Sequence, residues 1–199
     1  MKKLLLLFLL TATSCVAQKN SFHVTKVRAT VSAIDQGTAT IKTNHSGIDY
    51  LVEAEDVELQ KEYWFRLAKI EESHYRTRRA TILEKPVKTC RTSSAEAQDY
   101  LAGVAEFDFQ KDYHRDEEAS VKAVVIMVSA NAALLQFGQR KIRIFNARSL
   151  ETGKEYHFKL WNITILDNGF IWADVIGIPV KSCKTVLAEA RDYFKSTNL

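Results

Sequence analysis

The chain has 199 residues, of which 46% are apolar and 26% are charged, as in an ordinary globular protein. Two prolines and seven glycines exclude a low-complexity linker. The formal net charge is +4, and without Lys2 and Lys3 it is about +2, which is weak compared with the basic faces of dedicated nucleic-acid binders.

The N-terminus is typical of a secretory signal peptide. Lys2 and Lys3 precede an apolar run from Leu4 to Leu10, and small residues follow. The run is far shorter than the roughly 20 residues that span a bilayer, and no later stretch is long and apolar enough. The sequence therefore predicts a signal peptide over residues 1–14 and an exported protein.

Two cleavage sites are open. The segment Ala12-Thr13-Ser14-Cys15 resembles a lipobox, in which a lipoprotein signal peptidase cuts before a cysteine that becomes lipid-modified. The lipoprotein pattern usually has Leu where this chain has Ala12. The alternative is ordinary cleavage after Ala17, which would remove Cys15. The resemblance implies a lipid anchor at Cys15, in the periplasm or at the outer membrane.

The rest of the chain is a tandem duplication. Pro86-Val87-Lys88-Thr89-Cys90 matches Pro179-Val180-Lys181-Ser182-Cys183, so the two prolines of the chain align. The alignment runs without a gap from Tyr50 and Arg143 to Leu101 and Phe194. Upstream, residues 27–33 match residues 124–130, with four extra residues of the first repeat assigned to the loop at 44–47.

Each repeat reads as five strands. In the first repeat we expect strands at 24–34, 38–43, 50–54, 63–70 and 76–84. The apolar residues Tyr63, Phe65 and Leu67 alternate in the fourth strand, and Tyr156, Phe158 and Leu160 repeat the pattern in the second repeat. Period-two spacing is what a sheet packed on one face requires, so we assign these residues to the core. Asp167-Asn168-Gly169 predicts a hairpin turn.

Each repeat closes with a helix, which in the second repeat has an apolar stripe of Val186, Leu187, Ala190, Tyr193 and Phe194. Residues 107–118 are strongly acidic, and we interpret them as a solvated connector. The expected organisation is a first repeat at 22–106, this acidic connector, and a second repeat at 119–199.

Five short strands in this order resemble the OB fold, a small five-stranded barrel. The resemblance covers residues 24–88 and 121–181 and rests on strand count and order. It implies a mainly β protein with two tandem OB-like barrels, each followed by a C-terminal helix. An SH3-like barrel or a small sandwich is the alternative.

Motifs for catalysis are absent from the sequence. We find no GxSxG, HExxH, Walker loop or CxxC. The five histidines lack metal-ligand spacing, and acidic pairs such as Glu71-Glu72 point to opposite faces of a strand. We therefore expect a non-enzymatic protein without a cofactor or a metal.

Positions that differ between the repeats are candidates for binding. Next to the shared core residues, Trp64 and Arg66 of the first repeat align with His157 and Lys159 of the second, and Ala68 aligns with Trp161. We expect one accessible face in the first repeat that could bind anions, glycans or single-stranded nucleic acid by charge and stacking, and a more apolar surface in the second. The alternative is that these aromatic residues fill the barrels or their contact. The candidate residues are Trp64, Arg66, Arg76, Arg78, Trp161 and Trp172.

Cys90 and Cys183 occupy the same place in each repeat. In an exported chain such a pair suggests a disulfide. Two equivalent residues can come within about 7 Å only if an approximate two-fold axis passes close to both. Two alternatives stay open: each cysteine is a small buried apolar residue, or a thiol made reactive by the helix N-terminus.

Three functions are compatible with these features. The first is an envelope lipoprotein that acts as a two-barrel adaptor for a protein partner. The second is a protein that binds oligosaccharide or peptide with the Trp and Arg face of the first repeat. The third is a nuclease or a thiol enzyme. We favour the first, and do not expect nucleic acid as a partner because the protein is exported.

Overall fold

The computed structural model describes residues 23–44, 46–114 and 116–195. The predicted signal peptide and Cys15 lie outside these residues. The first repeat contains β1 (Thr25–Asp35), β2 (Thr38–Thr43), β3 (Asp49–Glu53), β4 (Glu62–His74), β5 (Thr77–Ile82), β6 (Val87–Lys88) and α1 (Cys90–Tyr100). The second contains β7 (Ala119–Val128), β8 (Ala132–Phe137), β9 (Arg140–Phe145), β10 (Glu155–Ile165), β11 (Ile171–Val175), β12 (Val180–Lys181) and α2 (Cys183–Lys195).

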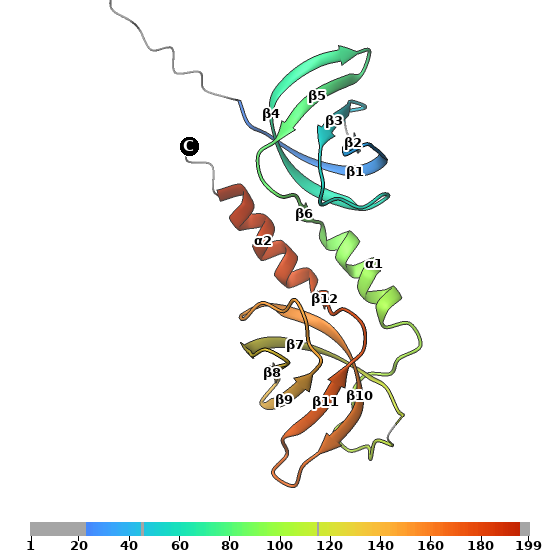
Figure 1. Cartoon of the computed structure of the whole chain (residues 1–199), viewed down its shortest axis with the longest axis vertical. Coiled ribbons are helices and arrows are strands. Elements are labelled where there is room, and N and C mark those ends of the chain that lie inside the picture. Colours follow the sequence, from blue (N-terminus) through green and yellow to red (C-terminus); the bar gives the residue numbers. More distant parts are fainter. Residues whose placement is uncertain (1–22, 45, 115, 196–199) are drawn as a thin grey trace, which may run out of the picture.

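Each repeat forms a closed five-stranded barrel (Figure 1). In the first, the order β1-β2-β3-β5-β4 closes because β4 also pairs with β1, and β3 pairs with β5 in parallel. The second barrel repeats this order with β7, β8, β9, β11 and β10. This is the strand order of the OB fold, so the predicted fold class of two tandem barrels with closing helices is confirmed.

Local turn chemistry sets the hairpins. Gln36 and Gly37 link β1 to β2 with φ of 46° and 81°, the positive pair that a tight two-residue hairpin needs. At the predicted turn 167–169, Gly169 has φ 74° and donates its N–H to the carbonyl of Leu166. The second turn matches the predicted one, and the first falls between the strands expected at 24–34 and 38–43.

The strand registers correct the alignment of the two repeats. Val27 pairs with Phe65, and Val121 pairs with Phe158, so Val27 is equivalent to Val121 rather than to Val124. In the third strand the residue equivalent to Tyr50 is Ile142 rather than Arg143. An odd shift moves every side chain to the opposite face of a strand, so this error hid which residues of β9 point outward.

The core is where the sequence places it. Tyr63 and Tyr156 are buried at equivalent positions, and Phe65 and Phe158 are fully buried. Each barrel has its own cluster of buried apolar residues. The prediction of equivalent buried sites in two barrels is confirmed.

Most residues of the acidic segment 107–118 are exposed, but the segment also packs on the second barrel, which the sequence did not predict. Phe107 is buried against the core of the second barrel, and Phe109 and Tyr113 pack beside it. The Phe107 ring stacks on Tyr113 with centroids 5.1 Å apart. The acidic residues led to the interpretation as a connector, but the three aromatic residues attach the segment to the second barrel.

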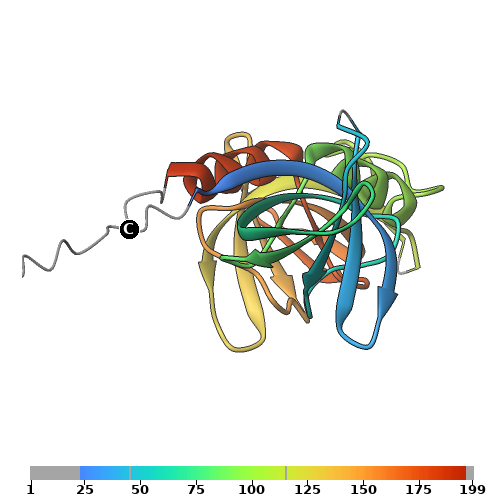
Figure 2. The ribbon, with the colours of Figure 1, turned by 90° about the horizontal axis from the view of Figure 1, so that it is seen from above.

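The closing helices lie between the two barrels, and each contacts the opposite repeat (Figure 1). The hydroxyl of Tyr193 on α2 accepts the backbone N–H of Arg66 in β4 at 2.9 Å. Reciprocally, the hydroxyl of Tyr100 on α1 accepts the N–H of Lys159 in β10 at 3.0 Å. Figure 2 shows α2 alongside β1, where Lys26 Nζ donates to the carbonyl of Phe194 at 3.2 Å.

This reciprocal arrangement has an approximate two-fold axis at the helix N-termini. Cys90 and Cys183, the first residues of α1 and α2, form a disulfide with Cα atoms 4.7 Å apart. The structure thus agrees with the first of the three interpretations of these cysteines, a disulfide, and with the two-fold geometry that the disulfide requires.

Replacing Phe158 with Ala is expected to lower the free energy of unfolding by about 3–5 kcal/mol, because it removes a fully buried ring and leaves a cavity. Urea unfolding measures the change. The control is Tyr75→Ala, at a side chain 88% exposed, with a change within about 0.5 kcal/mol. A loss below about 1 kcal/mol for Phe158→Ala would contradict the core assignment.

Removing the disulfide with the double substitution Cys90→Ala and Cys183→Ala is expected to destabilise the protein by about 2–5 kcal/mol. The bond closes a loop with a sequence separation of 93 residues, which restricts the unfolded chain strongly. Urea unfolding of both proteins measures the loss. Thiol titration of the unfolded, unreduced wild-type protein should find both cysteines blocked, and two reactive thiols at these positions would contradict the bond.

Candidate functional site

The outer surface of β8, β9 and β11 carries an aromatic and cationic face. Ile142 and Ile144 of β9 point into the core, so alternation turns Lys141, Arg143 and Phe145 outward. We call this the Trp172 face, and it consists of Leu134, Lys141, Arg143, Phe145 and Trp172.

The side chains of the Trp172 face are close enough to act together. Trp172 of β11 is the Cα partner of Arg143, which in turn is the partner of Leu134 in β8. The rings of Phe145 and Trp172 meet edge to face with centroids 6.1 Å apart. The Arg143 guanidinium lies 5.3 Å from the centre of the Phe145 ring. Trp172 is 43% exposed, so a planar ligand can reach its ring.

A cavity of about 220 Å³ adjoins this face at the hairpin ends of the barrel. Met127 and Phe170 line it together with Leu134 and Arg143, which also belong to the Trp172 face. Met127 is 58% exposed. The cavity therefore extends the face with apolar walls beside a cationic group.

The first barrel lacks this combination at the equivalent positions. The strand registers place Leu51 at the position of Arg143, Glu53 at that of Phe145 and Arg79 at that of Trp172. An aliphatic side chain therefore replaces the cation Arg143, a carboxylate replaces the Phe145 ring, and a cation replaces the Trp172 ring. The two barrels share a scaffold but present different chemistry on the same face.

Cationic side chains of the first barrel gather at the hairpin between β4 and β5. Arg76 has φ 65° and its guanidinium lies 5.3 Å from the ring centre of the exposed Tyr75. Arg78 pairs with Glu72 at 3.7 Å. These residues line a cavity of about 420 Å³, which could accept an anionic group.

The accessible Trp and Arg face expected in the first repeat does not exist. Arg66 is only 1% exposed, forms an ion pair with Glu84, and lies 5.7 Å from the ring centre of Tyr193. Trp64 contacts Phe194 edge to face at 5.4 Å. Both side chains do point out of the barrel, but α2 covers them. Arg76 and Arg78 lie at the hairpin, away from this contact.

The second-repeat candidates Trp161 and Trp172 are both partly exposed. Trp161 is the Cα partner of Asp174, which is two residues from Trp172 on the same outward row of β11. Diagonal neighbours on adjacent strands are within reach of large side chains. Trp161 therefore borders the Trp172 face.

Sequence reasoning missed Arg143 and Phe145. Their signal was present as strict alternation in Lys141-Ile142-Arg143-Ile144-Phe145, with the isoleucines inward. The shift of one residue in the alignment set Arg143 against the buried Tyr50, so the divergence at this face was not seen.

Residues 23–44, 46–114 and 116–195 contain neither a metal site nor a membrane-spanning helix. No group of His, Cys, Asp or Glu there could hold a metal ion. No helix in the same part of the chain is long and apolar enough to cross a bilayer.

No family model and no curated protein matches the chain. Among solved structures it is similar to a multidomain protein with nucleic acid binding domains from Streptococcus pneumoniae, at 11% identity and a TM-score of 0.26. That match covers 76% of this chain and 51% of the other, so the chain spans about half its length. A murine DNA binding protein bound with double-stranded DNA matches at 11% identity, TM-score 0.27, over 79% of this chain and 96% of the other.

Fission yeast Pot1 with single-stranded DNA matches at 10% identity and a TM-score of 0.25, over 88% of this chain and 91% of the other. At such identities the likeness concerns the fold alone.

We correct our preference for an adaptor, with a glycan or peptide binder as the alternative, and our exclusion of nucleic acid as a partner, because the structure exposes aromatic and cationic side chains on the Trp172 face. The glycan and peptide alternative depended on Trp64 and Arg66, and α2 covers both side chains.

Proposed function

We propose that the chain is a non-catalytic protein that binds single-stranded nucleic acid on the Trp172 face. The observation that carries this proposal is the row of Arg143, Phe145 and Trp172 on the outer side of β8, β9 and β11. In OB barrels this is the face, flanked by two hairpin loops, that binds oligonucleotides and oligosaccharides.

The chemistry of the face favours unpaired bases. Every base has a π surface that can stack on an exposed aromatic ring, and an adjacent arginine can contact a phosphate. A duplex keeps its bases stacked inside, so Trp172 could not reach them. Nearby Lys141 adds a second cation that can approach the backbone, and this contribution should weaken as salt screens it.

The cationic hairpin of the first barrel supports the same ligand. Arg76 and Arg78 line a cavity that can hold a phosphate, with the exposed Tyr75 ring beside it. The weak net charge of the chain makes these local groups, rather than a general basic surface, responsible for attraction. Binding should therefore depend on a few side chains.

Replacing Trp172 with Ala is expected to weaken binding of a ten-nucleotide single-stranded oligothymidine by roughly 5- to 150-fold, because one stacking contact contributes about 1–3 kcal/mol. Fluorescence anisotropy of the labelled oligonucleotide measures the affinity. Trp172→Phe should retain most of it.

Arg143→Ala should also weaken binding, whereas Arg148→Ala removes an equal charge from an exposed position outside the face and serves as its control. Equal affinity for the matched duplex, or unchanged binding after Trp172→Ala, would overturn the proposal.

Export with a lipid at Cys15 is part of the same proposal, with the protein held in the periplasm or at the outer membrane. The disulfide supports it, because such bonds persist in oxidising compartments outside the cytosol. The compartment determines where the protein encounters its ligand, but it does not change how a base would stack on the Trp172 face.

Mass spectrometry of the mature protein is expected to find an N-terminal Cys15 carrying a lipid. Cys15→Ala should release the protein from the membrane fraction, while Ala17→Ser, at the alternative cleavage site, should leave it anchored. A free N-terminus at Gln18 would contradict the anchor.

A further inference from the structure

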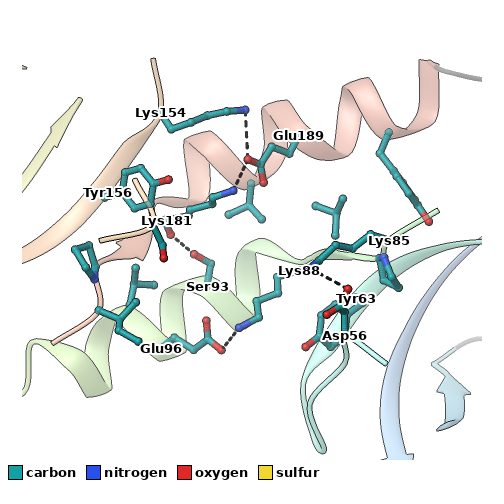
Figure 3. Close-up of a pocket in the computed structure, with 18 of the residues that line it drawn as sticks. Asp56, Tyr63, Lys85, Lys88, Ser93, Glu96, Lys154, Tyr156, Lys181 and Glu189 are labelled. Atoms are coloured by element: carbon teal, nitrogen blue, oxygen red, sulfur yellow. Dashed lines mark hydrogen bonds and ion pairs between the residues drawn. The ribbon is translucent and has the colours of Figure 1, made fainter. Parts of the chain in front are cut away.

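A second cavity lies between the two repeats, away from the Trp172 face. It has a volume of about 810 Å³ and is bounded by the two closing helices and the short strands β6 and β12 (Figure 3). Equivalent residues line it from both repeats, including Val87 with Val180 and Tyr63 with Tyr156. Its size falls in the range of small-molecule sites, which favour domain interfaces.

The lysines of this cavity are already paired. Lys88 contacts Glu58 at 2.7 Å and Glu96 at 2.8 Å. The hydrogen bond from Lys88 holds the pKa of Glu58 below its usual range, despite partial burial. Burial alone would lower the pKa of Lys88, but its two carboxylate partners raise it.

The second repeat reproduces this pairing. Lys181 contacts Glu151 at 2.7 Å. It also contacts Glu189 at 2.7 Å, and Lys154 reaches Glu189 at 3.3 Å (Figure 3). At the rim, Lys85 pairs with Asp56 at 3.0 Å. A charged ligand would have to break one of these pairs, so the lining selects against both anions and cations.

Two buried tyrosine hydroxyls provide the polar contacts. Tyr63 and Tyr156 are each 2% exposed, and their oxygens accept the backbone N–H groups of Glu58 and Glu151 at 3.0 and 3.2 Å. Within the described part of the chain, neither hydroxyl proton has an acceptor. A buried donor without an acceptor is costly, so both can donate to a ligand in the cavity. Burial raises the pKa of both tyrosines, which keeps them protonated.

We propose that this cavity binds an uncharged, largely apolar small molecule that accepts hydrogen bonds through carbonyl or ether oxygens. Val87 and Val180 provide apolar contact, and Tyr63 and Tyr156 donate to the oxygens from the two repeats. The site is independent of nucleic-acid binding, because no residue of the Trp172 face lines it.

Nile red, an uncharged and apolar dye with a carbonyl acceptor, is the probe for the test with the full mature protein. Saturable binding with one dye per chain is expected, with increased fluorescence. The double substitution Tyr63→Phe and Tyr156→Phe keeps both rings and removes both donors, and should weaken binding several-fold. Filling the cavity with Val87→Phe and Val180→Phe should abolish it.

Circular dichroism and an intact disulfide by mass spectrometry establish that each variant is folded. Trp172→Ala is the matched control and should bind the dye as the wild type does, because it alters only the outer face. Unchanged affinity in the folded tyrosine variant, or in the folded cavity-filling variant, would overturn the proposal. Equal binding of the anionic dye 1-anilinonaphthalene-8-sulfonate at this site would overturn the selection for uncharged ligands.

Discussion

The arrangement of the molecule depends on two tyrosine hydroxyls, each of which accepts a hydrogen bond from a backbone N–H of the opposite repeat. The Tyr193 hydroxyl accepts the N–H of Arg66, and the Tyr100 hydroxyl accepts the N–H of Lys159. The C-terminal end of each helix is therefore attached to the barrel of the other repeat. Loss of the Tyr193 hydroxyl would remove the acceptor of a buried N–H, at a cost of about 1–3 kcal/mol, whereas the Lys159 N–H is only partly buried. The disulfide joins the other ends of the same helices, so each helix is held at both ends.

This exchange decides which barrel surfaces remain accessible. On the first barrel α2 covers the outward side of β4, where Trp64 and Arg66 lie, and on the second α1 reaches the equivalent part of β10. The strands β8, β9 and β11 lie outside this contact, and there the aromatic and cationic side chains remain exposed. Helix exchange thus separates a structural side of each barrel from a side that can bind a ligand.

The sequence predicted most of the fold because the barrels are specified locally. Alternating Tyr63, Phe65 and Leu67 and the turn at Asn168-Gly169 need only their neighbours to be interpreted. The candidate site was harder to predict. Alternation correctly turned Arg66 outward, but its exposure depends on Tyr193, 127 residues later in the chain. Arg143 was missed because small differences in loop length shifted the alignment by one residue.

Duplication within one chain also allows equivalent positions to carry different residues, which a dimer of identical chains does not. In such a dimer every substitution appears on both sides of the axis. Here Ser93 donates a hydrogen bond to the carbonyl of Lys181, while the equivalent Val186 is buried and apolar. The same freedom lets Arg143, Phe145 and Trp172 occupy the outer face of one barrel, while Leu51, Glu53 and Arg79 occupy the equivalent positions of the other.

A single strand of nucleic acid has a direction, and an asymmetric pair of barrels can distinguish its two ends. The carboxylate of Glu53 would repel a phosphate at the position where Phe145 offers a ring, so the two faces are not interchangeable for such a ligand. The disulfide and the two tyrosine hydrogen bonds join the barrels, and so they hold the two different faces in one orientation relative to each other. Symmetry therefore stabilises the joint, while divergence gives the outer faces of the two barrels different chemistry, on which the proposed binding depends.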